Sequence, residues 1–217
     1  MAENKIILFS NLKGGVGKTT LCAHLANYLV SKGIGVAVVD ADLQQSLMNH
    51  RKRESAANPE QPIPWQVVGL PTSDKEKVAG IMKNLKTIPG YVLIDCPGTL
   101  NDPALQPIVS AADAAVIPIS YEDDTIDATG TFIKTFRQYS KAKMFFVPNR
   151  INTSEGRKAE LEQREATIKI LGRLGTVTPR IKQSVVVKRY STIFPLDSYQ
   201  HNALNYAFEA IINGLNN

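Results

Sequence analysis

The 217-residue chain is 43% hydrophobic and 21% charged, with a formal net charge of +5 at pH 7. This composition is typical of a globular domain that is large enough to fold unaided. No apolar run approaches the roughly 20 residues that span a bilayer, and the first apolar stretch is too short for a signal peptide. The two cysteines lie far apart, which argues against a disulfide framework or a zinc site. Membrane-spanning and disulfide-rich secreted classes are therefore excluded, and we expect a cytoplasmic protein.

The positive charge is concentrated in one part of the chain. Residues 134–190 hold 14 Lys and Arg against 4 Asp and Glu, whereas residues 1–133 hold 11 against 14. Residues 191–217 hold no Lys or Arg and 2 Asp and Glu. A local basic excess of this kind is a candidate footprint for an anionic polymer or surface.

Short apolar runs alternate with amphipathic stretches, which predicts an α/β fold with a mostly parallel, twisted sheet flanked by helices. We predict a single domain over residues 1–217. In chain order, the predicted strands cover residues 6–9, 36–39, 65–68, 92–94, 115–117, 145–147 and 175–177. The predicted helices cover about residues 19–31, 74–86, 103–111, 124–139, 155–172 and 199–213. A surface loop with three prolines is predicted over residues 56–64.

Three local patterns mark the expected helix ends. Gly33 follows the first predicted helix as a C-terminal cap. Ser73 and Glu76 have the spacing of a capping box. Asp102 and Pro103 have the pattern of an N-cap and a first helical position.

The most informative segment, residues 10–20, lies between the first predicted strand and the first predicted helix, as a phosphate-binding loop requires. Its glycines allow backbone N–H groups to approach phosphate oxygens closely, and the N-terminus of the helix adds partial positive charge. Lys18 would reach the β- and γ-phosphates, and the Thr19 hydroxyl would ligate Mg²⁺. The loop glycines are Gly14, Gly15 and Gly17.

The loop departs from the GxxxxGK[ST] pattern, because Leu12 occupies the position of the first glycine and Lys13 precedes the glycines. It resembles the deviant Walker A loop, KGGxGKTT, of the ParA/MinD family of partitioning and positioning ATPases. The resemblance implies a P-loop NTPase that binds ATP and Mg²⁺, with Lys18 catalytic. It also implies an ATP-bound homodimer in which Lys13 crosses the interface and contacts the phosphates of the other subunit. The implied nucleotide contacts are Gly14, Gly15, Val16, Gly17, Lys18, Thr19 and Thr20.

Two carboxylates follow the second predicted strand, where an open α/β sheet places ligand-contacting residues. The segment with Asp40 and Asp42 resembles the DxDPQ segment of the same family, with Leu43 in place of the usual proline. The resemblance implies that Asp42 orients or activates the attacking water, and that Asp40 supports the Mg²⁺ site.

A third carboxylate, Asp95, follows the apolar run at residues 92–94 and resembles the Walker B aspartate. In that role it would hold a water molecule of the Mg²⁺ shell. The chain has Gly98 where the family often has a second proline, so the adjoining loop is expected to be more mobile or to approach the γ-phosphate more closely.

Two later segments resemble the base-recognition elements of the family. Asn149 lies at the end of a predicted strand in the position of an asparagine that hydrogen-bonds adenine. Pro179 and Arg180 resemble a loop that packs on the same base. The resemblance runs, with gaps, from residue 5 to about residue 200.

The basic excess in residues 134–190 suggests which partner the predicted ATPase binds. In ParA-like proteins the ATP dimer joins basic patches into a face that binds DNA through its phosphates, without reading the sequence. We predict Lys182, Lys188 and Arg189 as DNA contacts. A membrane partner, as in MinD-like members, would need a basic amphipathic helix at the C-terminus. Residues 199–217 contain no Lys or Arg, so membrane binding is disfavoured.

The leading hypothesis is a small ParA-type partition ATPase, because the chain starts almost at the phosphate loop and leaves no room for an added DNA-reading domain. The ATP dimer would bind nonspecific DNA on the nucleoid, and a ParB-like activator or cargo adaptor would trigger hydrolysis and release. Two alternatives remain open. One is an ATPase that positions a protein assembly, such as a conjugation, chemosensory or microcompartment complex. The other is a metabolic kinase or amidoligase, which would need a second substrate pocket.

Overall fold

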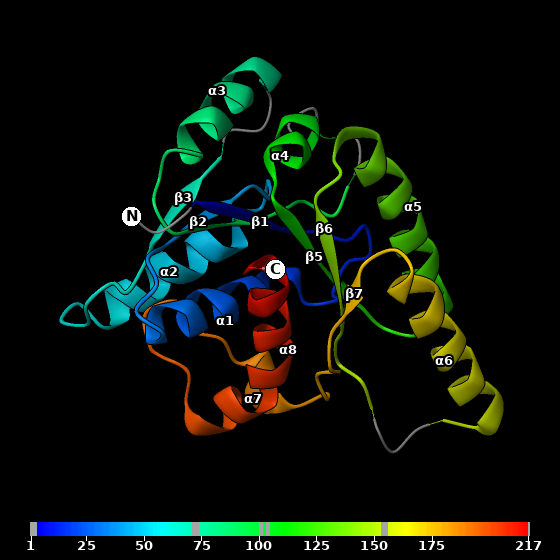
Figure 1. Ribbon diagram of the computed structural model, residues 1–217. Coiled ribbons are helices and arrows are strands. Elements are labelled where there is room, and N and C mark those ends of the chain that lie inside the picture. The colour runs from blue at the N-terminus through cyan, green and yellow to red at the C-terminus, as the bar shows by residue number, and fades with distance from the viewer. Residues whose placement is uncertain (1–3, 71–73, 100–101, 103–104, 153–155, 217) are drawn as a thin grey trace.

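The computed structural model describes residues 4–70, 74–99, 102, 105–152 and 156–216. Its strands form one parallel seven-stranded sheet in the order β3-β2-β4-β1-β5-β6-β7 (Figure 1). The predicted α/β class is confirmed, and every predicted strand overlaps an observed one. The strands are β1 Lys5–Phe9, β2 Val36–Asp40, β3 Gln66–Gly69, β4 Tyr91–Asp95, β5 Ala114–Ile119, β6 Lys143–Pro148 and β7 Thr176–Val177.

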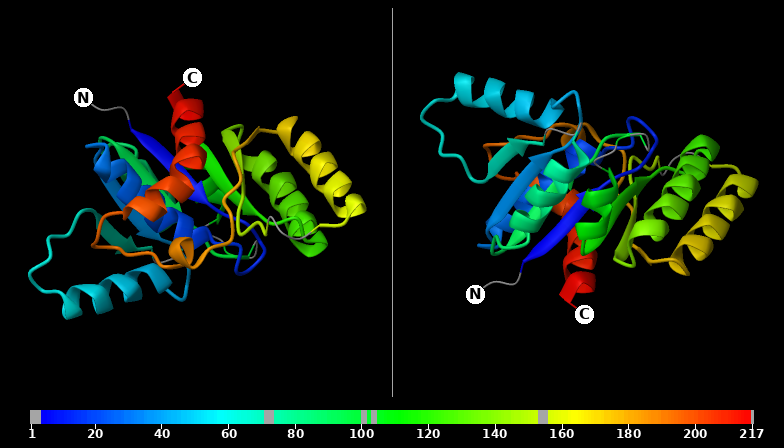
Figure 2. Two further views of the ribbon diagram at one scale, coloured as in Figure 1. Left: turned by 90° about the horizontal axis from the view of Figure 1, so that it is seen from below. Right: turned by 90° about the horizontal axis from the view of Figure 1, so that it is seen from above.

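Helices cover both faces of the sheet (Figure 2). The helices α3, α4 and α5 pack on one face, with α6 beside α5. The helices α1, α7 and α8 pack on the other face, with α2 beside α1. Their bounds are α1 Lys18–Ser31, α2 Ser46–Ala57, α3 Lys75–Leu85, α4 Leu105–Ala111, α5 Asp123–Tyr139, α6 Lys158–Gly172, α7 Val185–Lys188 and α8 Ser198–Asn216.

The central strand β1 contributes side chains to both layers of the core. Ile6 and Leu8 pack with α3, α4 and α5, whereas Ile7 and Phe9 pack with α1 and α8. All four side chains are fully buried. A strand that is covered on both faces has no polar side to show, so its sequence is apolar throughout.

Two helices were missed by the sequence analysis. Helix α2 buries only Leu47 and Arg51, so it has no apolar stripe that periodicity can detect. Because α2 runs to Ala57, the loop predicted over residues 56–64 begins later than expected. Helix α7 is a single turn, which Ser184 caps by accepting a hydrogen bond from the backbone N–H of Val187.

The helix caps agree only partly with the predictions. Gly33 has φ 74° and its N–H donates to a carbonyl in the last turn of α1, as expected for a C-terminal cap. The N-cap of α3 is Asp74, whose carboxylate accepts two backbone N–H groups of the first turn. Ser73, the predicted cap, and Pro103, the predicted first residue of the next helix, lie outside the described residues.

All seven strands run in the same direction, so their carboxyl ends meet at one edge of the sheet. The loops after β1, β2, β4 and β6 converge there, and they carry the site residues predicted above. Within the described part of the chain, we find no helix with both the length and the apolar character that crossing a bilayer demands.

Candidate functional site

The loop between β1 and α1 has backbone geometry that only glycine adopts readily. Gly15 has φ 77° and Gly17 has φ 101°. Gly17 lies directly before α1, and a Cβ atom at this residue would be 2.4 Å from the Asn149 Nδ2 atom. The first helical hydrogen bond runs from the Leu21 N–H to the Gly17 carbonyl. The N–H groups before Leu21 therefore have no acceptor within the helix and can serve an anion.

Lys18 and Thr19 form the first turn of α1 and face the neighbouring strand ends. The Lys18 Nζ atom lies 3.4 Å from the Lys13 carbonyl oxygen, so its ammonium group sits over the loop. The Thr19 hydroxyl donates a hydrogen bond of 2.6 Å to the Asp95 carboxylate, which comes from the end of β4. The hydroxyl and the carboxylate predicted to hold Mg²⁺ are therefore adjacent.

Asp95 and Asp40 are neighbours across β4 and β2, and both are buried. Burial raises the pKa of Asp95 to about 7, and the nearby Asp40 contributes in the same direction. Burial also raises the pKa of Asp40, although hydrogen bonds from the backbone partly oppose it. The Asp40 carboxylate accepts from the N–H of Met48, in the first turn of α2, at 2.9 Å and from the N–H of Asp42 at 3.3 Å. Asp40 thus holds the start of α2 and also lies beside Asp95.

Asp42 lies in the short loop between β2 and α2. Its carboxylate accepts a hydrogen bond of 2.9 Å from the Gln44 N–H, and it is only half-buried. Leu43, which replaces the usual proline, exposes 76% of its surface. Gln45 closes the loop with φ 47°, a left-handed conformation that is uncommon outside glycine.

Lys13 is tethered within its own chain. Its ammonium group forms an ion pair with Asp124 in the first turn of α5, and the hydrogen bond from Lys13 lowers the pKa of Asp124. The same contact raises the pKa of Lys13. Buried Asn11 accepts from the Lys13 N–H and donates to the Pro118 carbonyl and the Thr129 hydroxyl, which anchors the loop to β5 and α5. The lysine expected to act on a second subunit is thus held at the surface by a solvent-exposed contact.

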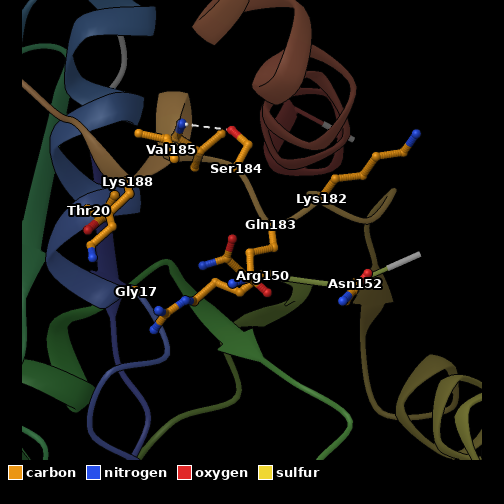
Figure 3. A pocket seen from close by; sticks show the side chains of 11 residues that line it. Gly17, Thr20, Arg150, Asn152, Lys182, Gln183, Ser184, Val185 and Lys188 are labelled. Carbon is orange, nitrogen blue, oxygen red and sulfur yellow. Dashed lines mark hydrogen bonds between the residues drawn. The ribbon is translucent and has the colours of Figure 1, made fainter. Parts of the chain in front are cut away.

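A cleft of about 510 Å³ opens beside the phosphate loop (Figure 3). It lies between the start of α1, the segment that follows β6, and the segment that leads into α7. Its lining residues are Gly17, Thr20, Asn149, Arg150, Asn152, Lys182, Gln183, Ser184, Val185, Val187 and Lys188.

Asn149 joins the two sides of this cleft. Its Nδ2 atom donates a hydrogen bond of 2.8 Å to the Val16 carbonyl. Its Oδ1 atom is buried and has no hydrogen-bond partner among the described residues. A buried acceptor without a partner is costly, so the Oδ1 atom suits a ligand that brings a donor, such as the amino group of adenine.

Arg150 belongs to the site but was not predicted from the sequence. Its backbone has φ 59°, and its guanidinium group donates a hydrogen bond to the Gly15 carbonyl within the loop. In Figure 3 its side chain extends toward Gly17. Its position directly after Asn149, the asparagine predicted to bind the base, was a usable signal, because the end of β6 contacts the phosphate loop.

Of the other residues predicted to contact DNA or the base, some line the cleft and others do not. Lys182 and Lys188, predicted as DNA contacts, line the cleft. Arg189, Pro179 and Arg180 are exposed and are not among its lining residues. Residues 182–185, a little further along the chain, line the cleft, and the contact of Pro179 and Arg180 with the base stays a prediction.

The residues present fit ATP and Mg²⁺. The loop amides and Lys18 suit a triphosphate, and the Asn149 Oδ1 atom lacks a donor. Within the described ranges, no group of three or more His, Cys, Asp and Glu side chains is arranged to hold a metal by itself. Magnesium typically takes few protein ligands and completes its shell with phosphate oxygens and water, so Thr19 and Asp95 suffice on the protein side.

Comparison with known proteins identifies relatives by sequence. Residues 7–189 match the protein family described as "CobQ/CobB/MinD/ParA nucleotide binding domain". The maintenance of carboxysome distribution protein A of Gloeobacter kilaueensis is 34% identical over 116 residues, which cover 52% of this chain and 48% of that protein. The protein of the same name from Halothiobacillus neapolitanus is 28% identical over 195 residues, or 87% and 85% of the two chains. The sporulation initiation inhibitor protein Soj of Bacillus subtilis is 27% identical over 170 residues, or 63% and 66%.

The chain thus spans about half the length of the Gloeobacter relative that it matches. Solved structures share the fold over nearly the whole chain. A putative plasmid partition protein of Borrelia burgdorferi bound to AMPPNP has a TM-score of 0.73 and 19% identity, covering 97% of this chain and 99% of that one. MinD of Pyrococcus horikoshii complexed with Mg-ADP has a TM-score of 0.73 and 20% identity, covering 99% of each chain.

The match covers most of the chain, and it includes the phosphate loop and the aspartates at the ends of β2 and β4. The same elements carry the site geometry described above. We conclude that the chain belongs to the CobQ/CobB/MinD/ParA family of nucleotide-binding domains, and within it resembles the ParA and MinD proteins.

Proposed function

We propose that this protein is a Mg²⁺-dependent ATPase of the ParA type that forms an ATP-bound sandwich dimer, binds nonspecific DNA and drives DNA partition. The observation that carries the proposal is the hydrogen bond from the Thr19 hydroxyl to the Asp95 carboxylate. It lies next to the phosphate loop, where the Lys18 ammonium group approaches the Lys13 carbonyl. This arrangement unites a triphosphate cradle and a metal-binding pair at the carboxyl edge of the sheet.

Each site residue has a definite task in this reaction. The N–H groups at the start of α1 bind the phosphate oxygens, and Lys18 neutralises the charge that develops on them. Thr19 and Asp95 would hold Mg²⁺, and Asp40 holds the start of α2 beside them. When bound, Mg²⁺ would neutralise further charge on the phosphates. Asp42, on its half-buried loop, orients the attacking water.

Lys13 completes the site of a second subunit in this proposal. To reach across, it must leave Asp124, and an exposed ion pair of this kind opposes the change only weakly because solvent screens it. In a single subunit, Lys13 therefore stays paired with Asp124. When the phosphate loops of two subunits face each other, Lys13 can leave Asp124 and contact the nucleotide of the other subunit. A ParB-like activator or cargo adaptor would then promote hydrolysis and release.

DNA binding is proposed from charge alone. Of the three predicted DNA contacts, Lys182 and Lys188 line the cleft, and Arg189 is exposed directly after Lys188 in the chain. Their cationic groups suit phosphates of either DNA or nucleotide.

A second candidate function is the positioning of a protein assembly. Two of the sequence relatives maintain carboxysome distribution, and one structure of similar fold is a Cyanothece McdA–ATP complex with a TM-score of 0.76 and 17% identity. The ATPase cycle would be the same and the cargo adaptor would differ. ATP turnover is measured with each candidate adaptor, one from a DNA partition system and one from a protein assembly. The adaptor that stimulates turnover identifies the cargo class.

The central test is nucleotide binding by a Lys18→Ala variant. Removing this ammonium group is expected to reduce the affinity for a fluorescent ATP analogue by at least about 100-fold, since a charge-assisted contact in a desolvated site contributes about 3 kcal/mol. Lys77→Ala, an exposed site on α3, serves as the control and is expected to bind like wild type. Unchanged affinity in the Lys18 variant would contradict the loop assignment. Turnover that requires a small acceptor, and not DNA or a protein partner, would favour a metabolic enzyme.

A further inference from the structure

Arg150 holds a carbonyl of the phosphate loop, and the function proposed above gives this contact no task. The residue lies just after β6, which ends at Pro148. Its guanidinium group donates a hydrogen bond to the Gly15 carbonyl, 135 positions away in the chain. Arg150 also lines both the nucleotide cleft and a smaller polar pocket of about 230 Å³. It therefore lies where the end of β6 meets the phosphate loop, as Figure 3 shows.

The backbone at Arg150 allows two successive side chains to reach the same loop. Successive side chains of an extended strand point to opposite faces of the sheet. Arg150 instead has φ 59°, a left-handed conformation that is uncommon for residues other than glycine. Asn149 donates to the Val16 carbonyl at 2.8 Å, and Arg150 donates to the neighbouring Gly15 carbonyl. Uncommon backbone conformations of this kind cluster at functional sites.

These two contacts set the direction of two N–H groups in the loop. In a planar trans peptide, the C=O bond and the N–H bond point in opposite directions. The Gly15 carbonyl shares its peptide group with the Val16 N–H, and the Val16 carbonyl shares its peptide group with the Gly17 N–H. Because both oxygens face the end of β6, both N–H groups point away from it. No described residue accepts a hydrogen bond from either group, so both can serve a ligand.

The same three residues have the backbone pattern of an anion-binding nest. Gly15 and Gly17 have positive φ, and Val16 between them does not. Alternation of this kind turns successive N–H groups toward one concave side. Glycine adopts either hand readily, so the loop has other conformations to choose from. Contacts from outside the loop are therefore needed to keep it in the binding form.

We propose that Arg150 is a positioning residue that orients the phosphate loop for the diphosphate part of a nucleotide. It acts through the Gly15 carbonyl and does not itself contact the nucleotide. Fixing this peptide group removes freedom that the loop would otherwise lose on binding, and this raises affinity. The ligand class is an anion with two linked phosphoryl groups, nucleoside diphosphates and triphosphates included.

Two observations favour this indirect role over a direct contact with phosphate. The guanidinium group already donates to the Gly15 carbonyl, and a cation for the phosphates is supplied by Lys18, whose ammonium group lies over the loop. A role in overall stability fits less well, because Arg150 is exposed and exposed side chains contribute little to the stability of the fold. The inference rests on the nucleotide binding proposed above and adds a residue to it.

The test compares Arg150→Ala and Arg150→Lys with a control that loses the same charge elsewhere. Alanine keeps a Cβ atom, so it removes the contact and leaves a similar backbone preference. Lysine can still donate one hydrogen bond to the Gly15 carbonyl. The control is Arg173→Ala, an exposed residue directly after α6. Affinities for ATP, ADP and inorganic pyrophosphate are measured by competition with a fluorescent ATP analogue. NMR relaxation of the Val16 and Gly17 amides reports loop motion in the nucleotide-free protein.

We expect Arg150→Ala to lose at least about tenfold in affinity for all three ligands, as expected for one hydrogen bond from a charged donor. The factor should be the same for each ligand, because all three use the same loop amides. Arg150→Lys should recover part of the loss, and Arg173→Ala should bind like wild type. The loop amides of nucleotide-free Arg150→Ala should be more mobile than those of wild type.

Four results overturn the proposal. One is unchanged affinity in Arg150→Ala. A larger loss for ATP than for ADP indicates a direct contact with the γ-phosphate, and an unaffected affinity for pyrophosphate indicates a contact with the base or ribose. Loss of affinity with unchanged loop motion indicates a direct contact with the other phosphates.

Two further outcomes remain informative. If Arg150→Ala does not fold, Arg150→Gln, which shortens the reach of the donor, takes its place in the same measurements. If wild type binds none of the three ligands, the proposed ATPase function fails. The NMR comparison then still decides whether Arg150 orients the loop, because it is made without nucleotide.

Discussion

The single residues that decide the chemistry lie at strand ends and differ in how tightly they are held. Asp95 is buried, whereas Asp42 is half-buried on a loop and its carboxylate accepts a hydrogen bond from the Gln44 N–H. A carboxylate that must turn toward a water molecule benefits from such freedom, and a carboxylate that holds a metal shell benefits from rigidity.

Replacing Asp42 with alanine should separate binding from hydrolysis. The side chain contacts neither the loop nor Thr19 among the interactions described above, so ATP affinity should stay within about threefold of wild type. Loss of the group that orients water should reduce turnover by at least about 100-fold. Phosphate release and nucleotide affinity measured on one preparation check both points. Brisk hydrolysis by Asp42→Ala would remove this residue from its role.

The ionisation of Asp95 should be visible in the stability of the nucleotide-free protein. Its folded pKa of about 7 exceeds the value of roughly 3.9 for an exposed carboxyl group. Between these values the folded state binds more protons than the unfolded state, so the free energy of unfolding falls as pH rises from about 4 to about 7. Above pH 7 the folded protein bears the full free-energy cost of burying the ionised Asp95 carboxylate.

The Asp95→Asn substitution removes this titration while preserving an acceptor for the Thr19 hydroxyl. At pH 8 and without magnesium, the variant should therefore unfold at higher urea concentration than wild type, and near pH 4 the difference should vanish. Urea titrations at both pH values provide the measurement. The variant should also lose Mg²⁺-dependent nucleotide binding. An identical pH dependence of stability in both proteins would contradict the assignment.

At the scale of elements, α2 links the site to a distant segment. Its first turn donates to Asp40, and its buried Arg51 donates to both oxygens of Thr192 and to the Trp65 carbonyl at 2.6–3.0 Å. The Arg51 guanidinium also lies 4.3 Å from the centre of the Trp65 ring. This helix, which lacks an apolar stripe, is therefore held by a buried polar cluster in addition to the single buried apolar side chain of Leu47.

Arg51→Ala should destabilise the protein by about 3 kcal/mol, because the buried carbonyls of Trp65 and Thr192 lose their donors. Arg53→Ala, on the exposed side of the same helix, should change stability by less than about 0.5 kcal/mol. Urea unfolding followed by circular dichroism compares the two. Equal midpoints would mean that α2 is anchored by other contacts.

At the scale of the whole molecule, the parallel sheet brings the carboxyl ends of its strands together at one edge, which carries the cleft. The proposed sandwich dimer would form at this edge, where the phosphate loop and Lys13 lie.

Lys13→Ala should bind ATP but fail to dimerise, because the lysine that bridges the two loops is missing. Sedimentation velocity in the Asp42→Ala background, which prevents loss of ATP through hydrolysis, provides the measurement. The Asp42 single variant should sediment as a dimer with ATP, and the Lys13 and Asp42 double variant as a monomer. A double variant that dimerises with ATP would show that Lys13 does not act in trans.

The sequence by itself determined the fold class, the strands and the phosphate loop. These features depend on local patterns: apolar runs covered on both faces, and glycines with a fixed spacing before Lys18 and Thr19. Family resemblance added Asp42, Asp95 and Asn149, and the comparisons confirmed that resemblance. No local pattern marked α2, because it buries only Leu47 and Arg51, and Arg51 bonds to Thr192, which lies 141 positions away in the chain.

Only the tertiary structure decided which distant residues share a surface. It joined Arg150 to the phosphate loop and Lys13 to Asp124, and it placed Lys182 and Lys188 at the cleft. It also joined the end of α5 to the segments before β6 and after α6, through hydrogen bonds from Arg137 to the Ala142 and Leu174 carbonyls. The physical reason is that these contacts depend on strand order and helix packing. Strand order and helix packing arise from the whole chain folding together, and a short stretch of sequence does not encode them.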